Sequence, residues 1–224
     1  MMTIVFALEF ESAGFRARLE PRLCVSVWTL GVMGRRSAPA LQNLLARHRP
    51  ALVVSAGFSG ALREGMPVGT IVLGGNFTDP HLLNSLPLPA GILVGKVVTA
   101  DHILETPSAK AEFAARSGGA LAADLESAHL HQVCLSAGVP MLSIRCISDS
   151  FAQSIAIPGS VLMDPETGRA NPQAIFQYLF RHPGKAPDFA RLVRDAKTAQ
   201  SALANALKSL LPALLQPETR LSHF

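Results

Sequence analysis

Cysteine is scarce in this sequence, whose 224 residues include only Cys24, Cys134 and Cys146. The three are far apart and show no spacing typical of metal ligands, which excludes a disulfide framework and gives no indication of a metal site. We therefore expect reduced cysteines in the core, and neither a metal ion nor an organic cofactor.

A segment typical of export or of membrane insertion is also lacking. The apolar stretch Met1–Leu8 has no basic flank before it, and Glu9 and Glu11 follow at once. Only 16% of the residues are charged, and the formal net charge of +4 is dispersed along the chain. Nucleic-acid binding needs a concentrated positive surface. We expect a cytoplasmic protein with no integral membrane segment and no nucleic-acid partner.

What the sequence does have is apolar content in short runs. Hydrophobic residues make up 49% of the chain, enough for a substantial core, and the length suits one domain. Strand-like and helix-like patterns alternate, which predicts a single domain over residues 1–224: a three-layer αβα fold around a mixed, mostly parallel sheet. Strands are expected at residues 3–8, 24–30, 51–55, 70–73, 91–99, 120–123 and 140–148, and helices at 12–19, 38–48, 108–116, 127–136 and 188–215. Residues 152–172 are expected to form a loop.

Three acidic residues follow predicted buried strands. They are Glu11, Glu126 and Asp149. Ligands of such sheets bind beyond the carboxyl ends of the strands, so the three carboxylates are expected to converge on one site. The alternative is that each acid caps a following helix, because acidic residues are favoured at helix starts. A predicted glycine-containing turn, Gly57–Gly60, would let the backbone approach a ligand closely.

Three segments, met in order, carry a resemblance to a known family. They are IVFALEFE, VVSAGFSGALREGMPVGTIVLG and ADLESAHLHQVCLSAGVPMLSIRCISDS, the last being the most specific. Together they resemble the 5′-methylthioadenosine/S-adenosylhomocysteine nucleosidases and the wider purine nucleoside phosphorylase superfamily. The resemblance covers residues 1 to about 150. Thr70 departs from it, since the family usually has an aspartate there.

The resemblance implies cleavage of the N-glycosidic bond of an adenine-type purine nucleoside, with three catalytic acids. Asp149 would donate a proton or hydrogen bond to purine N7. Glu126 would bind the ribose 2′- and 3′-hydroxyls and favour a cationic sugar, and Glu11 would be the general base that activates water.

The same resemblance implies a set of substrate-binding residues. Arg145 would help to order the acids, although a structural ion pair is an equal alternative, and Ser148 would fix Asp149. The remaining candidates would shape the walls for the sugar and the purine: Gly57, Phe58, Ser59, Gly60, His102, Ile103 and Leu125. Phe58 stands where the nucleosidases usually have a serine.

Hydrolysis and phosphorolysis both stay open on the sequence. Arg35 and Arg36 follow Gly34 where the nucleosidases lack arginine, and phosphorylases of this fold bind phosphate through arginine. In that case phosphate would be a co-substrate.

The aromatic stretch Ala174–Phe180 allows an apolar substrate tail or a peripheral membrane contact, besides core packing or a dimer contact. An apolar substrate tail would make the protein similar to the hopanoid-associated phosphorylases of the same superfamily, whose nucleoside substrate carries a lipid, and the high apolar content is compatible with such a member. A non-catalytic nucleoside-binding protein is a further alternative. The resemblance also implies a homo-oligomer, because members of this superfamily commonly complete their pocket with a neighbouring subunit.

Overall fold

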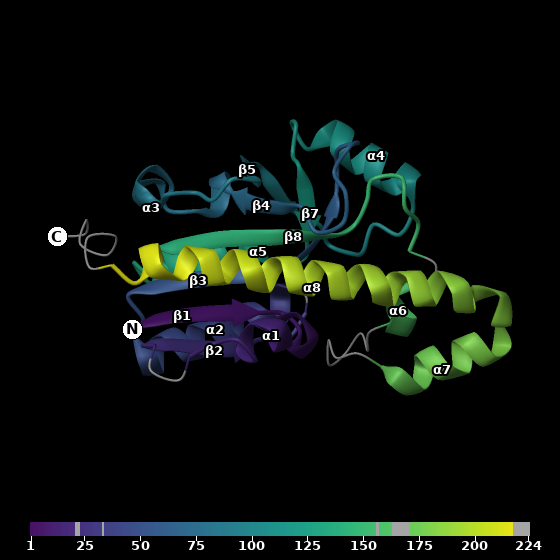
Figure 1. Cartoon of the computed structure of the whole chain (residues 1–224), viewed down its shortest axis with the longest axis horizontal. Coiled ribbons are helices and arrows are strands. Elements are labelled where there is room, and N and C mark those ends of the chain that lie inside the picture. The colour runs from purple at the N-terminus through teal and green to yellow at the C-terminus, as the bar shows by residue number, and fades with distance from the viewer. Residues whose placement is uncertain (21–22, 33, 156, 163–170, 217–224) are drawn as a thin grey trace.

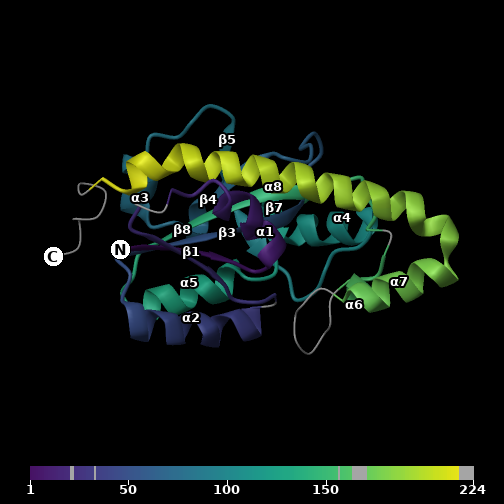
Figure 2. The same ribbon diagram turned by 60° about the horizontal axis from the view of Figure 1, so that its bottom comes forward.

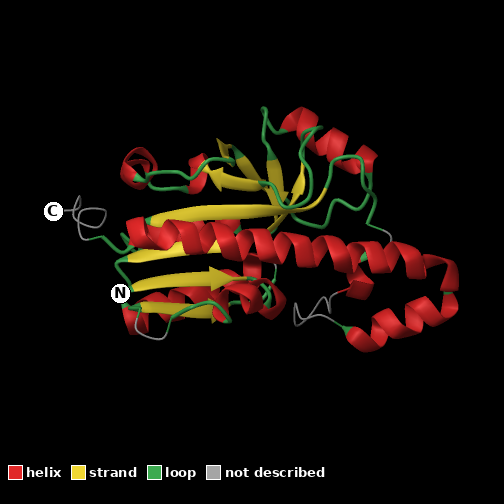
Figure 3. Ribbon diagram, in the orientation of Figure 1, coloured by secondary structure: helices red, strands yellow, loops and turns green. Residues whose placement is uncertain are grey.

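The computed structural model describes residues 1–20, 23–32, 34–155, 157–162 and 171–216, except for the side chain of Arg35. One twisted sheet lies between two layers of helices (Figure 1, Figure 3). Its strand order is β2-β1-β3-β8-β4-β5, with β6 and β7 joined to it where β7 pairs with β3. The β4–β8 and β3–β7 pairs are antiparallel, and the other pairs are parallel. The predicted mixed, mostly parallel sheet is confirmed.

Most strands and helices lie within a few residues of their predicted positions. The strands are β1 (Met2–Phe6), β2 (Val25–Thr29), β3 (Leu52–Ala61), β4 (Ile71–Gly74), β5 (Ile92–Gly95), β6 (Val97–Thr99), β7 (Ala122–Asp124) and β8 (Met141–Asp149). The helices are α1 (Glu9–Arg16), α2 (Gly34–His48), α3 (Pro80–Ser85), α4 (Pro107–Arg116), α5 (Ser127–Ser136), α6 (Gly159–Leu162), α7 (Pro172–Arg181) and α8 (Ala186–Leu214), with 3-10 turns η1 (Gly75–Phe77) and η2 (Pro183–Lys185).

The two faces of the sheet bury alternate residues of its strands. On β1, Ile4 and Phe6 pack with the apolar face of α8, including Leu203, whereas Val5 packs with α2 and α5, including Leu130. Successive side chains of a strand point to opposite faces, so one strand can supply both cores. Figure 2 shows α8 on one side of the sheet and α2 and α5 on the other.

Four sequence predictions were wrong. Gly57–Gly60 is not a turn, because β3 continues to Ala61 by pairing with β8 and β7. The predicted strand 91–99 is interrupted at Lys96 and forms β5 and β6. The predicted loop 152–172 contains α6, although its residues 156 and 163–170 lie outside the described part of the chain. Cys24 is exposed rather than in the core.

The two other cysteines are buried as expected. Burial raises the pKa of the Cys134 and Cys146 thiols to about 12, so both stay protonated at neutral pH.

Two helices project from the body of the molecule. The first half of α8 extends past the sheet, and α7 turns back alongside it (Figure 1). Within the described residues, no helix combines the length and the apolar character needed to cross a membrane.

Candidate active site

A cavity of about 490 Å³ opens at the carboxyl ends of β1, β3 and β8, and Glu11, Glu126 and Asp149 all line it. All three are buried. The predicted convergence of the three acids on one site is therefore present in the structure. The volume falls within the range of ordinary small-molecule sites.

Glu11 lies in the first turn of α1, directly after β1, and backbone N–H groups hold its carboxylate. Oε2 accepts hydrogen bonds from the N–H groups of Ala7 (3.1 Å) and Leu8 (2.9 Å), and Oε1 accepts one from Phe58 (2.8 Å). Burial raises the pKa of the Glu11 carboxyl above its ordinary value, against the opposing effect of these hydrogen bonds and of Arg145. Glu11 is thus both the cap of α1 and a group of the cavity wall.

Asp149 is the last residue of β8, and a β-bulge sets its direction. Ser59 is opposite Ile147 but Gly60 is opposite Asp149, so Ser148 is the extra residue. A bulge of this kind re-aims the side chain that follows it. Ser148 Oγ donates to Asp149 Oδ1 at 2.9 Å. Among the described residues after Asp149, the first helix begins at Gly159, so Asp149 does not cap a helix.

Glycines in β3 make room for two of these carboxylates. A Cβ on Gly57 would lie 3.2 Å from Glu11 Oε1, and a Cβ on Gly60 would lie 3.0 Å from Asp149 Oδ2. Both distances are tighter than ordinary van der Waals contact. The glycines predicted as a ligand-binding turn therefore sit against the acids themselves.

Glu126 precedes α5 at its N-cap position, yet its side chain makes no capping hydrogen bond. The N–H of Ser127 is bonded instead to the carboxylate of Asp124. The helix-cap alternative is therefore wrong for Glu126, whose carboxylate belongs to the cavity wall.

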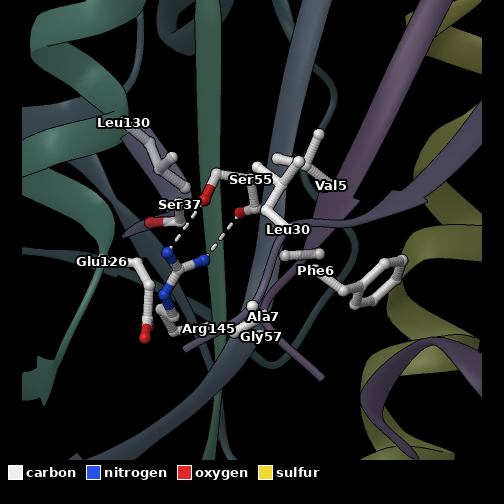
Figure 4. Close-up of a pocket in the computed structure, with 12 residues that line it drawn as sticks. Val5, Phe6, Ala7, Leu30, Ser37, Ser55, Gly57, Glu126, Leu130 and Arg145 are labelled. Atoms are coloured by element: carbon white, nitrogen blue, oxygen red, sulfur yellow. Dashed lines mark hydrogen bonds between the residues drawn. The ribbon is translucent and has the colours of Figure 1, made fainter. Parts of the chain in front are cut away.

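The side chain of Arg145 belongs to a buried hydrogen-bond network beside the cavity. Its Nε lies 2.7 Å from Asp124 Oδ2, and its terminal nitrogens donate to Ser55, Ile144 and Ser127. These contacts use all five N–H groups of the guanidinium. Figure 4 shows Arg145 bonded to Ser55 in a narrow pocket that Glu126 also lines. The structural ion pair is thus the alternative that is present.

The other predicted substrate-binding residues divide between two pockets. Those lining the large cavity are Phe58, Ser59, Gly60, His102, Ile103, Leu125 and Ser148. Gly57 and Arg145 line the narrow pocket instead. Ser59 Oγ is buried and has no hydrogen-bond partner among the described residues.

Comparison with known proteins shows which structures this chain resembles. The sequence profile of the Phosphorylase superfamily matches residues 79–181. No curated protein matched the sequence. Among solved structures, 5′-methylthioadenosine/S-adenosylhomocysteine nucleosidase from Neisseria meningitidis aligns with a TM-score of 0.71 at 17% identity, over 95% of this chain and 99% of that one. Futalosine hydrolase of Helicobacter pylori aligns with a TM-score of 0.64 at 14% identity, over 95% and 97%.

The chain therefore shares its fold with these nucleosidase and hydrolase structures. The region that matches the superfamily profile extends past residue 150, where the sequence resemblance becomes unclear, and includes α7.

Of the two predicted phosphate ligands, the structure places only one side chain, and it lies away from the cavity. Arg36 is exposed and does not line the cavity. The side chain of Arg35 lies outside the described part of the chain.

Sequence reasoning missed three features of the site. Lys110 of α4 lines the cavity and lies 2.5 Å from Asp149. Asp124 was seen only as a neighbour of Glu126, although it pairs with Arg145. An apolar wall, supplied by α6, α7, α8 and the segment before α6, forms part of the cavity lining, and its residues are Ile155, Leu162, Ile175, Leu192, Val193 and Ala196. The apolar spacing along α7 and α8 is the signal that could have indicated this wall.

Proposed function

We propose that this protein hydrolyses the N-glycosidic bond of an adenine-type purine nucleoside. The observation that carries the proposal is the meeting of three buried carboxylates, Glu11, Glu126 and Asp149, on one cavity. The shared fold supports it, since the structures that align with the chain include nucleosidases and a hydrolase, among them a nucleosidase bound to methylthio-immucillin-A.

Asp149 is the proposed acid. As the bond between C1′ and the purine breaks, its electron pair moves to the base, and the Asp149 proton moves to N7 of the leaving purine. The bulge at Ser148 and the hydrogen bond from Ser148 support this role, because they fix the direction of the carboxyl.

Glu126 and Glu11 are proposed to act on the sugar and on water. Glu126 would accept hydrogen bonds from the ribose hydroxyls, and its charge would favour the oxocarbenium-like sugar of the transition state. Glu11 would take a proton from the water that attacks C1′. The raised pKa of Glu11 supports this role, because a base works best when its pKa is near the working pH.

The remaining contacts of the substrate are proposed from the cavity lining. Phe58, His102, Ile103 and Leu125 would enclose the purine and the sugar, and Ser59 Oγ would bond to a polar group of the substrate. The apolar wall would receive the 5′ substituent. We therefore propose an apolar 5′ group, from a methylthio group to a longer chain.

The decisive experiment measures release of the base, with and without phosphate: adenine from 5′-methylthioadenosine, S-adenosylhomocysteine and adenosine, and hypoxanthine from inosine. The proposal expects release of adenine without phosphate, with the free ribose, or the free ribose bearing the 5′ substituent, as the sugar product. Strict dependence on phosphate, with the corresponding 1-phosphate as the sugar product, would establish a phosphorylase instead. Binding of these nucleosides without any turnover would establish the non-catalytic alternative.

The cofactor requirement, oligomeric state, cellular location and membrane contact of the protein are predictions, and each has its own measurement. The reaction is expected to need no metal or organic cofactor, so EDTA should leave the rate unchanged. Light scattering should detect a homo-oligomer, and cell fractionation should detect a cytoplasmic protein. Phe176 and Phe180 are 71% and 80% exposed on α7, close in sequence to Arg181 and Lys185, so flotation with anionic vesicles tests peripheral membrane contact.

A further inference from the structure

Lys110 is a buried lysine at the wall of the cavity, and the proposed reaction gives it no task. Its exposed fraction is 0%, and among the described residues only Lys110 and Arg145 are buried cations. Removing an ammonium group from water costs several kcal/mol unless close partners compensate. The partners of Lys110 therefore indicate what it does.

Those partners belong to Asp149 and to the loop that follows it. Nζ lies 2.5 Å from Asp149 Oδ2, as an ion pair and not as an aligned hydrogen bond. Nζ also donates to the backbone carbonyls of Ser150 (2.6 Å) and Gln153 (3.1 Å). Ser148 Oγ donates a hydrogen bond to the other oxygen, Oδ1. Each carboxyl oxygen of Asp149 therefore has a polar neighbour, Ser148 at Oδ1 and Lys110 at Oδ2.

The position of Lys110 in its helix gives no local reason for a cation. Lys110 ends the first turn of α4, whose start is capped by Thr106 and continued by Pro107. The start of a helix is positive, so a lysine there is locally unfavourable. The contact with Asp149 is the feature that compensates for this placement.

Other acids near Lys110 are engaged elsewhere. Asp149 is its only ion-pair partner among the described residues. Asp195 of α8 accepts a hydrogen bond from the Gln153 amide at 2.9 Å, and Glu105 accepts one from the N–H of Gly159 at 2.6 Å. The charge of Lys110 therefore acts mainly on Asp149.

We propose that Lys110 is a positioning residue for Asp149, an inference that rests on the proposed function. Its ammonium fixes the carboxyl group and stabilises the carboxylate that Asp149 becomes when its proton moves to the leaving purine. Lys110 transfers no proton in this step, and the purine leaves with the electron pair of the broken bond and the Asp149 proton.

The first test compares Lys110→Met with Gln153→Ala, which removes the amide between Ser150 and Asp195 but keeps the ammonium. Lys110→Met is expected to lower kcat by about 100-fold with little change in KM. Lys110→Arg, which keeps a cation at this position, should recover part of the lost kcat. Gln153→Ala should keep a kcat close to that of the wild type. A wild-type kcat in Lys110→Met, no recovery in Lys110→Arg, or an equal loss in Gln153→Ala would overturn the proposal.

A second test does not depend on activity. A crystal structure of Lys110→Met should show the Asp149 carboxyl turned away from its wild-type position, whereas Gln153→Ala should leave that carboxyl in place. If Lys110→Met does not fold, Lys110→Gln is the second neutral variant, since its amide can still donate to a loop carbonyl. An Asp149 carboxyl in the same position in the wild type and in Lys110→Met would contradict the role of Lys110, whereas a wild type that releases no base would contradict only the proposed function.

Discussion

A Cβ on Gly60 would lie 3.0 Å from Oδ2 of Asp149, so the absence of a side chain in β3 leaves room for the acid at the end of β8. The two residues are opposite each other in the sheet, immediately after the bulge. The same oxygen is held from the other side by Lys110, 2.5 Å away. The carboxyl therefore has little freedom to move.

Gly60→Ala should displace Asp149 by a few tenths of an ångström and lower kcat about 10-fold, because small misplacements of reacting groups are costly. Unfolding by urea should show a folded protein. The matched control is Gly184→Ala, since a Cβ at Gly184 meets no heavy atom within 4 Å. Equal kcat values for the two variants would show that Gly60 has no part in placing the acid.

The raised pKa of Glu11 predicts how activity depends on pH. Only the carboxylate can accept a proton from water, so kcat/KM should rise as pH passes up through this pKa, above the range of an ordinary glutamate. Glu11→Gln should remove that limb and lower kcat by about 100-fold or more. Glu9→Gln, on the exposed side of the same helix, is the control. If kcat/KM of Glu11→Gln rises with pH as it does in the wild type, the general base is another group.

Glu11 should affect stability in the opposite direction to activity: its contribution to the free energy of unfolding should decrease as pH rises. Because the folded pKa is above the unfolded one, its contribution to stability is complete below the unfolded pKa and is lost as pH rises through the folded pKa. Urea unfolding of wild type and Glu11→Ala across this window measures the difference. A difference that grows with pH in favour of the wild type would contradict the assigned direction.

Breaking the pair between Arg145 and Asp124 should destabilise the fold rather than alter the chemistry. Both side chains are buried, so Asp124→Asn would leave a buried guanidinium without its counter-charge and cost about 3–5 kcal/mol of unfolding free energy. The surface pair of Asp188 and Arg191 is the control, and Asp188→Asn should change stability by about 1 kcal/mol or less. Similar unfolding free energies for Asp124→Asn and Asp188→Asn would contradict a structural role for the Arg145–Asp124 pair.

The apolar wall predicts which 5′ substituents are preferred. Among 5′-thioadenosines, kcat/KM should be higher for uncharged alkyl groups than for the zwitterionic homocysteine group, by about 10-fold or more. Val193→Asp, which adds a charge to the wall, should narrow that preference, while Asp188→Asn, on the same helix α8 but outside the cavity lining, should not. A wild type that prefers the zwitterionic substrate would contradict the assignment of this wall.

The fold and the three acids could be predicted because each depends on local pattern. Buried strands appear as apolar runs, and Glu11, Glu126 and Asp149 are the acids that follow them. The predicted turn at Gly57–Gly60 failed because glycine is typical of turns. Only the long-range pairing of β3 with β7 and β8 shows that this segment is a strand.

The rest of the site could not be predicted, because it depends on tertiary contacts that no local sequence pattern indicates. A lysine in a helical segment normally belongs to a solvated face, and nothing near Lys110 in the sequence indicates an acid 39 positions away. Likewise, Ile175 and Val193 face the same cavity only because α7 turns back along α8.

Adenine release from 5′-methylthioadenosine without phosphate, by the wild type, Asp149→Asn and Asp101→Asn, tests the central claim most directly. Asp101 is an exposed acid that does not line the cavity. The wild type and Asp101→Asn should release adenine at similar rates, and Asp149→Asn should be slower by about 100-fold to 10,000-fold while remaining folded. A folded Asp149→Asn protein that releases adenine at the wild-type rate would contradict the account.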